Sequence, residues 1–137
     1  MATIGLHRIS LRRAVLTVAG DDYRASVNQV ELIPEPLWEW ESPLGADPMR
    51  GAYPVLTGVR WTVLVGFVQD FRTPDSLSVY LVEHAAQIKT VTFTPDDGGR
   101  TVTVDVMILP ARLGGVTGDI LTAVAELPAY GAPDLGE

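Results

Sequence analysis

Apolar and polar residues alternate with a period of two along most of this chain, the pattern of β-strands that bury one face. The pattern predicts strands over residues 13–20, 23–33, 55–70, 90–95, 101–110 and 120–128, and residues 37–41 ("LWEWE") extend the second of these. The first two strands are expected to pair as an antiparallel hairpin across the turn "GDD". The apolar positions change parity at Asn28 and Gln29, which predicts a β-bulge there.

The strand over residues 55–70 is apolar on both faces. One parity carries Val55, Thr57, Val59, Trp61, Val63, Val65 and Phe67, whereas the other carries Leu56, Leu64 and Val68. A strand of this kind is buried on both faces or meets another subunit.

One helix is predicted, over residues 73–87. Thr73 is a good N-cap, Pro74 suits the first helical position, and Asp75 favours the positive end of the helix dipole. The expected apolar stripe consists of Leu77, Tyr80, Leu81, His84, Ala85 and Ile88.

The second half of the chain predicts a hairpin and a final strand. "TVTFTP" and "TVTVDVMILP" flank the turn "DDGGR", and a glycine-rich connection, "ARLGGVTGD", precedes the last strand. Apolar side chains at 102, 104, 106 and 108, and at 121, 123, 125 and 127, should face the core. We therefore expect one domain over residues 1–137, mainly β: an antiparallel β-sandwich or barrel with one flanking helix and loosely held termini.

The segment from Ser42 to Pro54 has no helical or strand periodicity and reads as a long loop. Long loops inside compact domains are uncommon and are usually functional or disordered. An idle surface loop is the plain alternative.

Charge is negative and uneven along the chain. Seventeen acids face ten bases, a formal charge of −7, and Lys89 is the only lysine. Residues 8–24 carry four arginines against two aspartates, whereas residues 31–47 carry five acids and no base. This asymmetry could let one end of a subunit attract another end of a copy. It could equally be accident. The single lysine and the lack of a basic run argue against nucleic-acid binding by attraction, and solubility is the plain interpretation of the overall acidity.

We predict no enzyme, cofactor or metal site. Two histidines, His7 and His84, and no cysteine cannot supply a zinc site, and neither "GGVTGD" nor "DDGG" matches a phosphate-binding loop. A carboxylate pair for hydrolysis stays an open alternative, since seventeen acids always offer one. We expect no signal peptide and no membrane span.

The order of motifs resembles a known family. A strand ending in "FVQD", a proline, the helix "SLSVYLVEH" and the strand "VTFTP" are similar to major tail proteins of long-tailed bacteriophages, particularly those that infect high-GC actinobacteria. The closing run "LPARLGGVTGDILTAVAELPAYGAP" resembles the end of that family. The likeness covers about residues 14–133, and its motifs are weakly specific. It departs at "HAAQI", where a glycine would be expected to close the helix.

This resemblance implies a tail tube subunit. Such subunits form six-fold rings that stack into a tube, through which double-stranded DNA passes without specific binding. The implied partners are further copies of the chain and other tail proteins (tape measure, tail terminator, distal tail), and the implied location is the virion tail, assembled in the bacterial host cytoplasm. The alternative from another class is a monomeric β-barrel that binds a small ligand.

Two sets of residues are then expected to act in the tube. We predict that the acidic and hydroxyl side chains Thr101, Thr103, Asp105, Thr122 and Glu126 face the channel, where they would not hold DNA. They could equally be ordinary solvated strand faces. We predict that the loop is an inter-ring stacking arm, with Pro43, Gly45, Pro48, Met49, Arg50 and Tyr53 as its contact residues.

Overall fold

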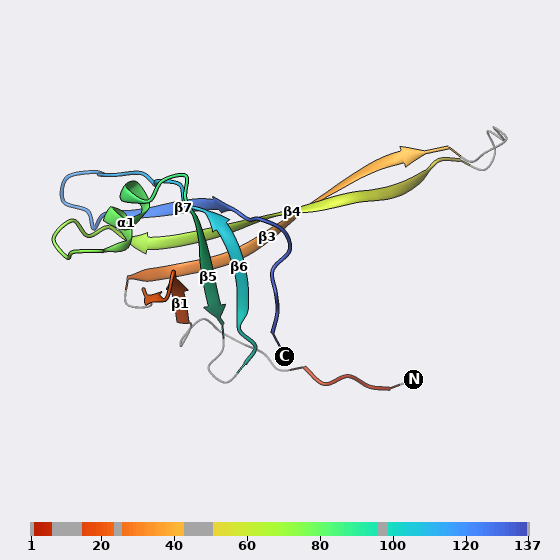
Figure 1. The fold of residues 1–137 in the computed structure, drawn as a ribbon, viewed down its shortest axis with the longest axis horizontal. Coiled ribbons are helices and arrows are strands. Elements are labelled where there is room, and N and C mark those ends of the chain that lie inside the picture. Colours follow the sequence, from red (N-terminus) through yellow and green to blue (C-terminus); the bar gives the residue numbers. More distant parts are fainter. Residues whose placement is uncertain (1, 7–14, 24–25, 43–50, 96–98, 137) are drawn as a thin grey trace.

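The computed structural model describes residues 2–6, 15–23, 26–42, 51–95 and 99–136. Its elements are β1 (Val15–Val18), β2 (Asp21–Asp22), β3 (Val27–Glu41), β4 (Tyr53–Val68), α1 (Leu77–Glu83), β5 (Ile88–Thr94), β6 (Val102–Met107) and β7 (Thr122–Pro128). They form two antiparallel sheets, ordered β2-β1-β5-β6 and β3-β4-β7, with α1 beside them (Figure 1). The predicted fold, a β-sandwich with one helix, is confirmed.

The core lies between the two sheets and under the helix, and strand alternation selects its members. β4 contributes Val63, Val65 and Phe67, which are at most 2% exposed. The predicted inward faces of the last two strands are also confirmed, because the buried side chains there are Val104, Val106, Ile108, Ala123, Ala125 and Leu127.

The predicted hairpin between residues 13–20 and 23–33 is wrong. The turn at Ala19 and Gly20, both with positive φ, returns the chain for only the two residues of β2. β1 instead pairs along its whole length with β5, and β3 pairs with β4 in the other sheet. This arrangement buries Leu16 and Val30 on the inner faces of different sheets, which one hairpin could not do.

The bulge predicted at Asn28 is confirmed by a register shift between Val27 and Gln29 in the β3–β4 pair. Gly66 of β4 lies opposite Gln29. A Cβ on Gly66 would lie 2.7 Å from Asn28 Oδ1 and 2.8 Å from Gln29 Cβ. The bulge therefore requires glycine at this position.

The helix is shorter than predicted and begins later. Thr73 and Pro74 precede it, Ser76 is its N-cap residue, and Asp75 has a φ of 60°, which is not helical. The side chain of Asp70 prevents an earlier start of the helix, because its Oδ1 accepts hydrogen bonds from the amides of Arg72 and Thr73. A hydrogen bond from the Thr73 side chain, followed by these two amide bonds, lowers the pKa of Asp70. The amide bonds hold residues 70–73 in a turn that is not helical.

The predicted apolar stripe of the helix is confirmed at its first three members. Leu77, Tyr80 and Leu81 are buried, whereas Ala85 is exposed and Ile88 lies in β5, also exposed. Ala86 takes the positive φ of 69° that a glycine would normally supply after the helix. Its amide then donates to Ile108 O at 2.7 Å, which ties the end of the helix to β6.

The C-terminal segment follows the open edge of β6, in contrast to the predicted loose tail. Tyr130 N donates to Asp105 O at 2.7 Å, and Asp134 exchanges two backbone hydrogen bonds with Thr103. Covering an edge strand in this way removes a surface on which another chain could add.

Candidate functional site: the arm of the β3–β4 hairpin

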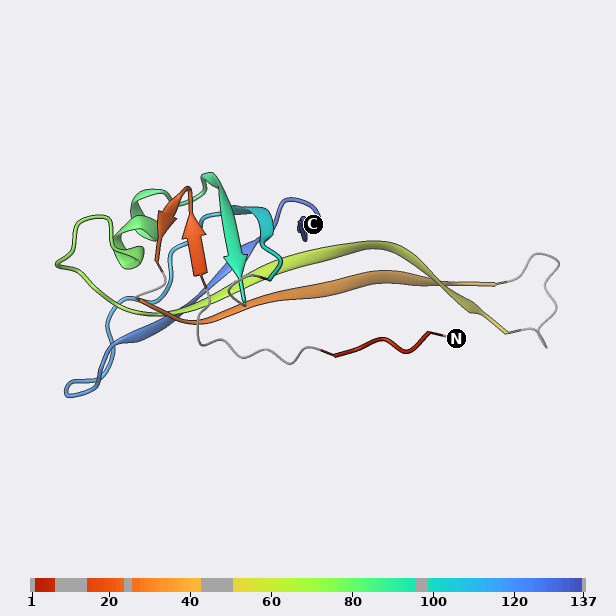
Figure 2. The same ribbon diagram turned by 90° about the horizontal axis from the view of Figure 1, so that it is seen from below.

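The β3–β4 hairpin extends far beyond the two sheets (Figures 1 and 2). β7 pairs with β4 only from Thr62 to Val68, whereas β3 and β4 stay paired out to Glu41 and Tyr53. We call residues 34–41 and 53–61 the arm. Its two strands have no third strand beside them in the described chain.

The arm has one apolar face, and this face continues the core. Residues paired across an antiparallel ladder share a face. Leu32 and Val63 pack in or against the core, so Pro34 with Trp61 and Pro36 with Val59 follow them outward. Beyond the bulge, the same face of β3 carries Trp38 opposite Leu56 and Trp40 opposite Pro54.

The outer part of this face is a groove of about 460 Å³ lined by Trp38, Trp40, Pro54 and Leu56. The two indole rings meet edge to face, with centroids 5.1 Å apart. Trp38 is 50% exposed, Trp40 61% and Leu56 62%. Large contiguous apolar patches on soluble proteins mark interaction sites.

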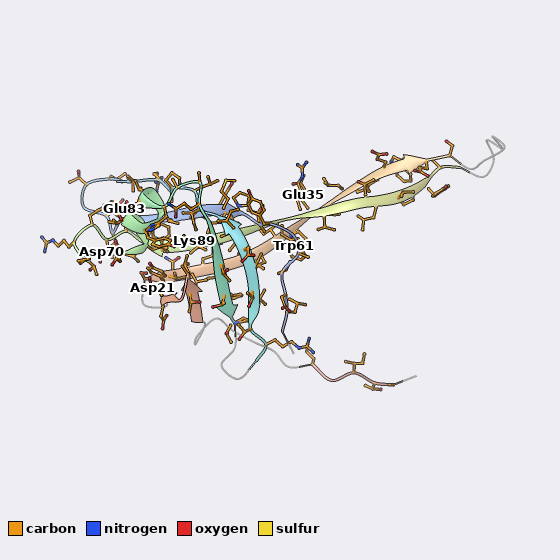
Figure 3. All side chains as sticks on the ribbon, in the orientation of Figure 1. Asp21, Glu35, Trp61, Asp70, Glu83 and Lys89 are labelled. Carbon is orange, nitrogen blue, oxygen red and sulfur yellow. The ribbon has the colours of Figure 1, made fainter. Side chains whose placement is uncertain are left out.

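The opposite face of the arm carries acidic side chains among apolar ones, because Leu37, Val55 and Tyr53 share this face. It carries Glu35, Glu39 and Glu41, all exposed, and Arg60 stands directly across from Glu35 (Figure 3 labels Glu35). Towards the sheet, the same face continues with Glu31. Glu31 pairs with Leu64 of β4, and Leu64 pairs on its other side with Glu126 of β7. The charged side chains of the arm are therefore confined to one face, and the other face is apolar throughout.

Two prolines protect the open edge of β3. Trp61 O accepts a hydrogen bond from Ala129 N, so the backbone of Trp61 points away from β3. Its cross-strand partner Pro34 must then point to the open edge, and so must Pro36 two residues on. Proline has no amide to offer, so a further strand cannot pair continuously along this edge.

A second register shift lies inside the arm, between Leu37 and Trp38. Thr57 is the extra residue on β4, and its Oγ1 donates to Leu37 O at 3.0 Å. The hydroxyl replaces a ladder bond at the bulge, where the local twist of a hairpin increases.

The five predicted channel residues do not share one surface. Thr101, Thr103 and Asp105 lie on or just before β6, in the four-stranded sheet. Thr122 and Glu126 lie on β7, in the three-stranded sheet. Each group faces away from the core, and the outer faces of two packed sheets point in opposite directions, so one channel wall could hold only one group.

The outer face of the four-stranded sheet is rich in hydroxyls that bond to each other. Thr90 Oγ1 donates to Asp105 Oδ1 at 2.7 Å, Thr94 Oγ1 lies 2.9 Å from Thr101 Oγ1, and Thr17 is hydrogen-bonded to Thr92. The sequence pattern had indicated this polar face correctly for β6.

The predicted stacking loop is narrower than Ser42 to Pro54. Tyr53 and Pro54 are already in β4, where Tyr53 pairs with Glu41 and is 47% exposed. Tyr53 and Pro54 extend the β3–β4 pairing, because their partners Glu41 and Trp40 continue the alternating strand pattern of β3. Pro43, Gly45, Pro48, Met49 and Arg50 lie outside the described residues.

Sequence reasoning missed Trp38 and Trp40 as site residues. The signal was the strict alternation of tryptophan and glutamate in "LWEWE", with Pro34 and Pro36 in the same parity before it. The sequence pattern predicts this stretch only as the extension of a strand.

The histidine and tyrosines near the helix act in packing. The His84 ring stacks on Tyr80 at 4.1 Å, and its Nδ1 is 3.1 Å from Tyr80 O. Burial, followed by the charge of Asp21, raises the pKa of Tyr23 to about 12.

His7 lies outside the described residues. Within them, no group of three or more His, Asp or Glu side chains is arranged to hold a metal ion. Among the described residues, no helix combines the length and the apolar character needed to cross a membrane.

Comparisons with known proteins show similarity only at the level of structure. No family model and no curated protein sequence matches the chain. A chain of the solved structure "Virion of native gene transfer agent (GTA) particle" matches with a TM-score of 0.63 and 12% identity, over 89% of this chain and 95% of that one. The two chains therefore share a fold along nearly their whole lengths.

Proposed function

We propose that this chain is a structural protein of a virion: a tail tube subunit that self-assembles into stacked hexameric rings and forms the conduit for a phage genome. It would be assembled in the host cytoplasm together with other tail proteins. This role needs no catalysis, cofactor or metal.

The observation that carries the proposal is the apolar face of the arm. Trp38, Trp40 and Leu56 are at least half exposed in the single chain, although their face is continuous with the core. Burying apolar area contributes ~25 cal/mol per Å², so a surface of this kind favours being covered. The fold that this chain shares with a chain of a virion particle supports a structural role in which another subunit covers this face.

The channel face of such a tube would be the outer face of β3, β4 and β7. The charged side chains of this face are Glu31, Glu35, Glu39, Glu41 and Glu126, against the single base Arg60. They stand with Thr122 among the exposed apolar side chains Ile33, Val68 and Val124. Duplex DNA carries one negative charge per ~1.7 Å of axis, so a wall of carboxylates would not retain it. Screening over ~8 Å at physiological salt makes the effect short-ranged. Thr101, Thr103 and Asp105 would then face the outside of the tube.

Residues 43–50, which connect the two strands of the arm in the sequence, would contact the neighbouring ring. Their sequence has two prolines, which cannot donate a ladder hydrogen bond, and a methionine, which adapts to irregular pockets. Replacing residues 43–50 by a short Gly-Ser linker should leave a folded subunit with unchanged thermal stability that no longer forms tubes.

Negative-stain microscopy of the purified full chain over a range of concentrations tests the proposal. Rings or tubes are the expected result. A chain that stays near 14.8 kDa and forms no ordered assembly in any condition would contradict it. Tubes that place Glu126 on the outer wall would leave the assembly role intact and refute the channel assignment.

A further inference from the structure

The outer part of the arm, beyond its bulge, is paired one residue out of step with the inner part. We call residues 38–41 and 53–57 the outer arm. Trp38 pairs with Leu56, and Thr57 is left over on β4 without a residue opposite it. Every pair further out is displaced by this one residue, so the bulge alone sets the register of the outer arm.

The extra residue decides which side chains of β4 lie beside the two tryptophans. Side chains alternate between the two faces of a strand, so an extra residue transfers all those beyond it to the opposite face. Leu56 and Pro54 therefore line the groove with the tryptophans. In a pairing without the bulge, Thr57 and Val55 would take their place, and Leu56 and Pro54 would lie on the face of the glutamates.

The sequence of the outer arm accepts both pairings. Residues 53–57 read "YPVLT", with no charged side chain to distinguish a buried from a solvent-facing side, and register is weakly specified in such strands. β7 pairs with β4 only from Thr62 to Val68, so no third strand of the described chain fixes the outer arm. The two strands are joined through residues 42–52, a connection longer than the tight turns that fix the register of a hairpin.

The observed pairing places Pro54 where its missing amide costs no hydrogen bond. The peptide groups of successive residues in a strand point alternately to its two edges. The backbone of Pro36 points to the open edge of β3, so that of Trp40 does too, and that of Glu41 points to β4. Pro54 lies opposite Trp40, at a pair that exchanges no ladder bond. In the shifted pairing it would lie opposite Glu41, and one ladder bond would be lost.

The shifted pairing gains at the bulge what it loses at Pro54. In the observed pairing, the bulge interrupts the ladder, and the hydroxyl of Thr57 donates to Leu37 O at 3.0 Å in place of a ladder bond. This substitute bond is exposed to water. In the shifted pairing, the ladder would continue through Thr57 without a bulge. Each pairing therefore lacks one ladder bond, and the backbone does not strongly favour either.

We propose that the outer arm exchanges between two registers, the observed one and one shifted by a single residue of β4, and that the tryptophan groove is complete only in the observed one. The exchange itself is a property of the single chain. Its consequence rests on the proposed function: a neighbouring copy that covers the groove binds only the observed register, so the shifted register lowers the apparent affinity between copies.

Fluorine NMR of the full chain labelled with 5-fluorotryptophan tests the exchange. The chain has three tryptophans, of which Trp38 and Trp40 lie in the outer arm and Trp61 lies in the inner part. We expect a second signal, or relaxation dispersion, from Trp38 and Trp40. Trp61 is the internal control and should show neither. Exchange at all three tryptophans would mean that the whole arm moves and would overturn the inference, as would one signal without dispersion from each.

Two variants should change the populations in opposite directions. Pro54→Ala supplies the missing amide and should raise the ratio of shifted to observed register roughly two- to tenfold, the equivalent of one net hydrogen bond. Deletion of Thr57 removes the extra residue and leaves Leu56 opposite Trp38 in a regular ladder, so the second signal should disappear. Unchanged populations in Pro54→Ala, or exchange that persists in the deletion variant, would contradict the two-register account.

Disulfide trapping gives an independent result, because the chain has no cysteine of its own. Trp38→Cys/Leu56→Cys reports the observed register, and Trp38→Cys/Thr57→Cys reports the shifted one. Trp38→Cys/Val55→Cys is the matched control, since Val55 lies opposite Trp38 in neither register. In a glutathione buffer, the first two should form an intramolecular disulfide and the control should not. Circular dichroism of each reduced variant confirms that it is folded.

The outcomes separate this inference from the proposed function. A disulfide in Trp38→Cys/Thr57→Cys that forms no faster than in Trp38→Cys/Val55→Cys would overturn the register exchange. Tubes formed by a chain without exchange would retain the proposed function and remove this inference. Exchange in a chain that never forms rings would support the two registers and count against the tail tube.

Discussion

The side-chain amide of Gln69 forms two hydrogen bonds with Gly114, one with its backbone N–H and one with its backbone C=O. Gly114 N donates to Gln69 Oε1 at 2.9 Å, and Gln69 Nε2 donates to Gly114 O at 3.0 Å. Gln69 is only 9% exposed, and its amide nitrogen also donates to Thr122 O, so both of its polar atoms are satisfied. One buried side chain thus joins the end of β4 to the 111–121 loop and to the start of β7.

Replacing Gln69 by leucine should release this loop. The backbone groups of Gly114 would lose their partners, and an unsatisfied, partly buried polar group costs ~1–3 kcal/mol of unfolding free energy. Urea unfolding measures this loss, and hydrogen exchange should speed up at the Gly114 amide. Gln87→Leu is the matched control, because the side chain of Gln87 is exposed, and it should change neither quantity. Equal stability of the two variants would refute the role of Gln69.

Gly66→Ala should destabilise the fold, whereas Gly58→Ala on the same strand should not. A Cβ at Gly66 meets Asn28 and Gln29 at 2.7–2.8 Å, whereas a Cβ at Gly58 meets no atom within 4 Å. Forcing atoms into a packed site typically costs ~1–3 kcal/mol. Thermal unfolding of both variants provides the comparison. If they melt at the same temperature, the bulge at Asn28 does not depend on glycine.

Leu81→Ala tests the packing of the helix on the sheets. Leu81 is 1% exposed, and truncating a buried leucine typically costs ~2–5 kcal/mol through lost contacts and a cavity. Val82 is its neighbour on the same helix and is 46% exposed, so Val82→Ala is the control and should cost far less. A loss below ~0.5 kcal/mol for Leu81→Ala, within the range of surface substitutions, would mean that α1 does not pack as described.

Alkaline pH should destabilise the protein through Tyr23. Its pKa in the folded chain is about 12, against 10.0 when unperturbed, because burial penalises the phenolate. A raised pKa means that the folded state holds the proton more tightly, so this contribution is complete below pH 10 and is lost as the pH rises towards 12.

Tyr23→Phe removes the titrating group and should flatten the fall in melting temperature between about pH 10 and pH 12. It also removes the hydrogen bond from Tyr23 Oη to Asp75 O, so the variant should be somewhat less stable at pH 7. Tyr130→Phe, at an exposed position, is the control. An unchanged slope in Tyr23→Phe would exclude Tyr23 as the source of alkaline unfolding.

The sequence predicted most strands and their buried faces, because strand alternation records burial directly. The even positions of β6 and the odd positions of β7 were assigned correctly for this reason. Alternation does not record which strands pair, however. β1 carries the same signal whether it joins β3 or β5, and only the need to bury Leu16 and Val30 in two different sheets decides between them.

Local sequence signals could not fix the start of the helix, and they could not show that the predicted channel residues are divided between two sheets. Thr73 and Pro74 are good local signals for a helix, but the side chain of Asp70 binds the amides of this turn first. Asp105 and Glu126 both lie on polar strand faces, and nothing local separates the outer face of one sheet from that of the other. Trp38 and Trp40 were visible in the sequence, yet their exposure depends on how far β7 extends along β4.

A cryo-electron microscopy map of an assembly formed by the full chain tests the central claim, that the apolar face of the arm is covered by another copy. We expect Trp38, Trp40 and Leu56 to be buried against a neighbouring subunit, with Glu35, Glu39 and Glu41 facing water on the other side of the arm. A map in which the two tryptophans face solvent, with the glutamates at the contact between copies, would contradict the account.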